Sequence, residues 1–215
     1  MFHVVYKLLW VLLMLLLVPI FVTRVLPYAD AELPALLVPV EDCQILCFMG
    51  IIPGQTSLPE AMRLLRENDW VDAINVHDYR IDVRARSAEG WVGWSWNLEL
   101  SNEIDISRPG QLHYSEALGH TVVEGLYIPT RYRAALLGQG FGSPDFGGSG
   151  IDGDQRLSYL VVYDQGQENL QVKVKTTLAC PASLLDYWYS PAEIILTTAR
   201  LSLPYVPPDA AVQKC

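Results

Sequence analysis

Residues 79–101 read YRIDVRARSAEGWVGWSWNLELS, the stretch from which the fold is most readily predicted. Apolar and polar residues alternate at both of its ends. The apolar positions are Tyr79, Ile81, Val83 and Ala85 in the first run, then Val92, Trp94, Trp96, Leu98 and Leu100 in the second. A period of two residues is typical of a strand with one buried and one solvated face. We therefore expect a hairpin of Tyr79–Arg86 and Trp91–Ser101, with its turn at Ser87–Gly90.

A short amphipathic helix is expected just before this hairpin. Ser57 and Glu60 have the spacing of a capping box, and Pro59 falls in the first turn, where its missing N–H costs nothing. Apolar residues then recur every three or four positions, which predicts a helix over Leu58–Asn68. A third strand is expected after the hairpin, within Gly119–Ile128.

The same order of elements recurs in the second half of the chain. RYRAALLG predicts a helix with Thr130 as its cap and Gly138 at its end, and a glycine-rich loop follows. Strands are predicted over Ser158–Asp164, Leu170–Thr176 and Glu193–Leu203. The sequence thus predicts an α+β fold in which a helix followed by three antiparallel strands occurs twice. These two helix-plus-antiparallel-sheet units are expected over 47–128 and 129–205, before a tail at 206–215.

The amino terminus carries an apolar run, LLWVLLMLLLVPIFVTRVL, over Leu8–Leu26. The sixteen residues between Lys7 and Arg24 are uncharged, and the apolar flank before Lys7 extends the run toward the roughly 20 residues that a spanning helix needs. This predicts a transmembrane helix within 1–26, with the lipid bilayer as a partner. Acidic residues downstream favour a single-pass protein of the cell membrane whose body lies on the extracytoplasmic side.

The segment 27–46 contains three prolines and is predicted to be an extended tether. An alternative for the apolar run is a signal peptide, because Ala29-Asp30-Ala31 has the small-x-small form that a signal peptidase accepts. Cleavage near Ala31 would release a secreted protein.

Charge and cysteine content narrow the classes of partner. A net charge of −9 and an isoelectric point near 4.8 argue against nucleic acid, which is bound by clustered Lys and Arg. Four cysteines in an exported chain favour oxidation, and one bridge is expected among Cys43, Cys47 and Cys180. Spacing does not fix the pairing. Cys215, the last residue printed, is expected to be a free thiol or an intermolecular link.

The stretch GIIPGQTSLPEAMRLL resembles the opening of the SmpA/OmlA, or BamE-like, small envelope domain, which begins with a Gly-x-Thr turn and a short helix. Gly54, Thr56 and Leu65 match that opening. In the second half, Leu137-Gly138 with 143–146 is similar to the close of such a helix. The chain departs from the family in lacking the Gly-x-Pro after the first helix and a lipidated cysteine. The resemblance implies a layered α+β envelope domain in tandem, without catalytic residues and with a protein partner in the envelope.

Four histidines invite comparison with enzymes. His113, Glu116 and His120 do not have the spacing of a zincin, whose two ligands sit four residues apart with Glu beside the first. His77 precedes Asp78, but no G-x-S-x-G motif is present. No catalytic, cofactor-binding or metal-binding residue is therefore predicted. The alternative is an exported hydrolase or metal-binding enzyme that uses His77, His113 or His120.

Aromatic residues give the most suggestive candidate surface. Trp94 and Trp96 share the apolar face of the hairpin and are expected in the core. The candidates for a partner surface are Trp91, Tyr187, Trp188 and Tyr189. The sequence thus predicts a membrane-tethered, extracytoplasmic binding or scaffolding protein that is not an enzyme.

Overall fold

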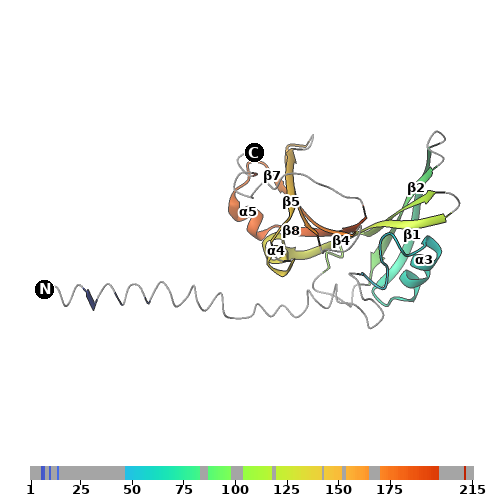
Figure 1. The fold of residues 1–215 in the computed structure, drawn as a ribbon, viewed down its shortest axis with the longest axis horizontal. Coiled ribbons are helices and arrows are strands. Elements are labelled where there is room, and N and C mark those ends of the chain that lie inside the picture. The colour runs from blue at the N-terminus through green and yellow to red at the C-terminus, as the bar shows by residue number, and fades with distance from the viewer. Residues whose placement is uncertain are drawn as a thin grey trace. The chain divides into compact units, whose positions relative to one another are not determined.

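One antiparallel sheet of eight strands organises the computed structural model (Figure 1). The structure describes residues 47–82, 87–97, 104–117, 120–141, 143–151, 154–164 and 170–198, and five single residues, Tyr6, Lys7, Trp10, Met14 and Ala211. The chain divides into two compact units, Met1–Ala35 and Leu36–Cys215. All elements below belong to the second unit.

The sheet consists of two four-stranded meanders that meet at their last strands. Its order is β1-β2-β3-β4-β8-β7-β6-β5. The strands are β1 (Val71–Asp82), β2 (Ser87–Trp96), β3 (Gly110–Ala117), β4 (His120–Arg133), β5 (Phe146–Ile151), β6 (Arg156–Asp164), β7 (Gln171–Ala179) and β8 (Pro191–Thr197). The helices are α3 (Leu58–Glu67), α4 (Ala134–Phe141) and α5 (Leu184–Tyr189).

The predicted α+β class, with two separate helix-plus-sheet units, is wrong, because the described chain is mainly β and its strands form a single sheet. The join between the meanders is a seam in which Leu126 of β4 pairs with Leu196 of β8, and Ile128 pairs with Ile194. All four side chains are fully buried. Residues 66 and 70 positions apart in the chain thus form the centre of one core, a pairing that local alternation does not reveal.

The predicted transmembrane anchor is also overturned, as far as the described residues extend. None of the helices that they form is both long and apolar enough to cross a membrane. The lipid bilayer as a partner and the single-pass localisation depended on that helix and are withdrawn with it. Of Leu8–Leu26, only Trp10 and Met14 are described. The rest of that run, the tether and the cleavage site near Ala31 lie outside the described residues.

The helices lie against one face of the sheet, which is the core face. Helix α3 contacts β1 and β4, whereas α4 and α5 contact each other and β7. Trp94 and Trp96 point into this face, as predicted, with 0% and 4% of their surface exposed. Gly110 lies opposite Trp94 in the register, and a Cβ at Gly110 would overlap the indole ring. A glycine is therefore needed beside the largest buried side chain.

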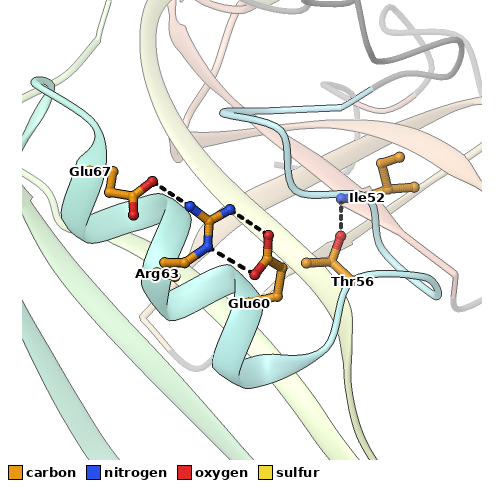
Figure 2. Close-up of polar contacts among 5 residues, drawn as sticks. All are labelled: Ile52, Thr56, Glu60, Arg63 and Glu67. Atoms are coloured by element: carbon orange, nitrogen blue, oxygen red, sulfur yellow. Dashed lines mark hydrogen bonds and ion pairs between the residues drawn. The ribbon is translucent and has the colours of Figure 1, made fainter.

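Helix α3 forms almost where the sequence predicts it, ending at Glu67 rather than Asn68, with Pro59 in its first turn. The predicted capping box is absent, because Ser57 makes no side-chain cap bond. Glu60 instead forms an ion pair with Arg63 at 2.6 Å. Arg63 also reaches Glu67 one turn later, and Figure 2 shows both pairs. These exposed pairs link neighbouring turns of the helix and stabilise it only modestly.

The predicted second helix begins too early. Residues 130–133 continue strand β4, and α4 starts only at Ala134. Thr130 does not cap the helix, because its hydroxyl donates to the carbonyl of Ala192 on β8 at 2.7 Å. The backbone N–H of Ala134 donates to the carbonyl of Ser190. Contacts with a distant strand therefore hold this segment extended against its local helical pattern.

Candidate functional site

Helix α5 is short but held at its start by a complete capping box. Ser183 Oγ accepts a hydrogen bond from the backbone N–H of Asp186, and Asp186 Oδ2 accepts one from the backbone N–H of Ser183 at 2.7 Å. The Ser183 hydroxyl also donates to Asp186 Oδ2 at 2.7 Å, and this bond, together with the one from the Ser183 backbone, lowers the pKa of Asp186. Sequence reasoning missed this helix, although Ser-x-x-Asp before an apolar pair was a usable signal.

The two sides of α5 differ sharply in burial. Tyr187 faces the sheet, where its ring meets that of Tyr159 at 5.2 Å and 89°. Large apolar side chains occupy the other side, with exposed fractions of 43% for Leu184, 66% for Leu185, 43% for Trp188 and 61% for Tyr189. This two-turn helix thus packs Tyr187 against the sheet and exposes four large apolar side chains to solvent.

Arg133, at the end of β4, completes this surface. Its guanidinium carbon lies 4.6 Å from the centre of the Tyr189 ring, a cation–π contact. An exposed contact of this kind is worth about 0.5–1 kcal/mol. Arg133 forms no ion pair with any described residue. We call the set Leu184, Leu185, Trp188, Tyr189 and Arg133 the α5 patch.

The predicted partner surface therefore divides. Trp188 and Tyr189 belong to the α5 patch, but Tyr187 is buried beneath it. Trp91 lies on β2, in the other meander, and is only partly exposed. The four candidates do not form one surface.

The three histidines of the alternative enzyme hypothesis lie in two places. In the sheet register His77 is opposite Trp91, which is opposite His113, so these residues form one row across β1, β2 and β3. His120 begins β4 and pairs with Ala117, further along the hairpin. No three His, Cys, Asp or Glu among the described residues come close enough together to hold a metal ion.

His113 lies on the sheet face opposite the core, in a half-buried aromatic pair. Its ring lies 4.5 Å from that of Tyr127. Burial lowers the pKa of His113, and the nearby carboxylate of Glu124 partly opposes this shift. Burial also raises the pKa of Tyr127, as does the charge of Glu193. Both shifts favour the uncharged forms at neutral pH, and the two rings meet as a tilted aromatic pair with 40° between their planes.

The substitution Glu124→Gln is expected to lower the pKa of His113 further, because it removes the charge that stabilises the imidazolium. A folded pKa below the ordinary 6.5 means that the unfolded state binds more protons, so stability is full above pH 6.5 and falls as pH drops through the folded pKa. The measurement is an NMR titration of the His113 ring protons. Glu67→Gln, on α3, is the control, and a raised or unchanged pKa in Glu124→Gln would contradict the assignment.

Both described cysteines, Cys47 and Cys180, are disulfide-bonded, and no described cysteine is free. Cys47 is almost fully buried and Cys180 follows β7. Cys43 and Cys215 lie outside the described residues. The bridge expected among Cys43, Cys47 and Cys180 therefore stays a prediction.

A pocket of about 720 Å³ lies between α3 and the turns that precede it. Much of its polar lining is already bonded within the chain. Thr56 Oγ1 accepts from the backbone N–H of Ile52 at 2.8 Å, as Figure 2 shows, and Glu60 is paired with Arg63. Asn68 accepts a bond from the Trp70 backbone. The pocket thus offers few unused groups for recognising a ligand.

Comparison of this chain with protein-family models, with curated proteins and with solved structures gave no match. The resemblance to the BamE-like domain therefore stays an expectation that rests on Gly54, Thr56 and Leu65.

Proposed function

We propose that this protein is a non-catalytic binding or scaffolding protein that engages a protein partner through the α5 patch. The observation that carries the proposal is the exposure of Leu184, Leu185, Trp188 and Tyr189 on one short helix. Apolar side chains scattered singly over a surface are ordinary, whereas contiguous ones mark interaction sites.

The size and composition of the patch support this function. A large aromatic side chain presents about 150–250 Å² when bare, so these four side chains together show on the order of 400 Å². That is the size of the largest, often functional, patch on a typical monomer, about 300–600 Å². Trp, Tyr and Arg are also the residues most enriched among those that dominate binding energies at interfaces.

The helix is fixed in place before any partner binds. Tyr187 packs on Tyr159, and the capping box holds the first turn. A surface that is already ordered loses less conformational entropy on association than a flexible segment, so more of its contact energy contributes to affinity.

The test is site-specific photo-crosslinking of the full chain in the cells that normally make it. A photoreactive phenylalanine analogue at position 185 is expected to give one dominant heavier adduct. The same analogue at Ile151, an apolar residue on β5 that is 51% exposed, is expected to give none. This comparison distinguishes a specific binding surface from nonspecific hydrophobic association.

The second arm adds Trp188→Ala to the photoreactive chain. Loss of the adduct is the expected result, and the melting temperature of the variant checks that the fold is intact, because the Trp188 ring also lies 6.3 Å from that of Tyr187. Equal adducts at positions 151 and 185, or an adduct that persists without Trp188, would contradict the proposal.

A further inference from the structure

We infer that the partner of the α5 patch carries a carboxylate beside an apolar pocket, and that Arg133 pairs with this carboxylate. The inference rests on the proposed function and names the chemistry of its partner. It comes from the position of one cation among four exposed apolar side chains.

The electrostatics of the patch differ from those of the chain. The protein carries a net charge of −9, yet the exposed guanidinium of Arg133 is part of the patch and has no ion-pair partner among the described residues. Asp186, the one charged residue within α5, stays ionised, but its Oδ2 already accepts two hydrogen bonds from Ser183 within the cap. The charged group of the patch that is left for a partner is therefore the guanidinium of Arg133, which suits an anion.

The geometry of Arg133 suits recognition of a carboxylate. The ring of Tyr189 lies 4.6 Å from the guanidinium carbon and supports this flat group without using its hydrogen-bond donors. A guanidinium held in this way presents parallel N–H groups that match the two oxygens of a carboxylate. Trp188 and the two leucines then supply the apolar contact.

A second copy of this chain fits the patch less well. A stable interface buries about 800 Å² on each partner, roughly twice the apolar area on offer here. Two chains of net charge −9 also repel each other. A partner whose groove encloses α5 gains contacts on the flanks of the helix that a flat self-association lacks.

A lipid surface is likewise disfavoured. Asp186 lies between Leu185 and Tyr187, and its hydrogen bonds from Ser183 lower its pKa and keep it ionised. Pressing α5 into a bilayer would bring this charge toward hydrocarbon, which is costly.

The experiment compares two fluorescent probes on the full chain. The first is 1-anilinonaphthalene-8-sulfonate, which joins aromatic rings to one anion, and the second is Nile red, which is neutral. Trp188→Ala is expected to raise the dissociation constant of each probe about tenfold. Arg133→Gln is expected to raise the dissociation constant of the anionic probe alone, by roughly five- to tenfold, because it removes one charge-assisted contact. Arg66 is an exposed arginine on α3. Arg66→Gln therefore removes one positive charge away from the patch and is expected to leave both dissociation constants unchanged.

Each other outcome is decisive. If Trp188→Ala affects the probes but Arg133→Gln does not, the inference about the carboxylate fails while the proposed function stands. If Trp188→Ala changes neither probe, the proposed function fails as well. Trp188-dependent sedimentation with phosphatidylcholine vesicles, or a Trp188-dependent dimer in sedimentation equilibrium, overturns the assignment in favour of a bilayer or a second copy.

Discussion

Replacing Trp94 by alanine is expected to lower the free energy of unfolding by about 3–5 kcal/mol. The indole is completely buried, and its ring meets that of Trp96 at 5.3 Å, edge to face. Its Nε1 has no hydrogen-bond partner among the described residues, so the substitution sacrifices packing alone. Gly110, the residue opposite, has no side chain to fill the cavity. The surrounding strands are therefore expected to relax only partly.

Chemical denaturation followed by circular dichroism measures this loss. Trp188→Ala is the matched control, because it removes the same side chain from an exposed site and should change the stability by no more than about 0.5 kcal/mol. Similar losses of unfolding free energy in the two variants would contradict the assignment of Trp94 to the core and of Trp188 to the surface.

Leu196→Ala is expected to lower the free energy of unfolding by about 2–5 kcal/mol. The variant is expected to unfold in a single transition. Leu196 lies on β8 at the seam, opposite Leu126 on one side and Val172 on the other, and all three side chains are fully buried. Since the two meanders share this core, weakening the seam should destabilise both together.

The measurement follows unfolding by far-ultraviolet circular dichroism and by tryptophan fluorescence, to which the first meander contributes three of the six tryptophans of the chain, Trp91, Trp94 and Trp96. Leu185→Ala, at a leucine that is 66% exposed, is the control and should have little effect on stability. Two separated transitions in Leu196→Ala would show instead that each meander folds by itself.

The alternation of apolar and polar residues predicted those strands whose own sequence shows a period of two. The hairpin of β1 and β2 formed because the alternation around Trp94 gives one apolar face, although β1 begins eight residues earlier than expected. The predicted turn at Ser87–Gly90 is wrong, because these residues belong to β2. Strand β3 was missed because its polar residues, in HYSEA, resembled a loop. Strand β5 was missed because FGGSGI is rich in glycine, which is depleted in strands. The pairing of these segments with neighbouring strands overrides their weak propensity.

The candidate site was predicted only in part for a similar reason. Trp188 and Tyr189 were predicted because clustered aromatic residues are suited to binding a partner. Arg133 did not, because its contact with Tyr189 joins residues 56 positions apart and depends on how β4 and α5 pack. The burial of Tyr187 depends likewise on Tyr159 of β6. Residue type suggested the chemistry of the surface, and only tertiary structure defined its members.

The position of β8 has a consequence for synthesis of the protein. This strand comes last among the eight in the chain, yet it lies at the centre of the sheet, between β4 and β7. Until residues 191–197 have left the ribosome, β4 and any emerged part of β7 lack their shared neighbour and have open edges. Unpaired edges recruit strands from other chains. The nascent protein is therefore most prone to aggregate just before its eighth strand emerges, and it gains a complete core when that strand closes the gap.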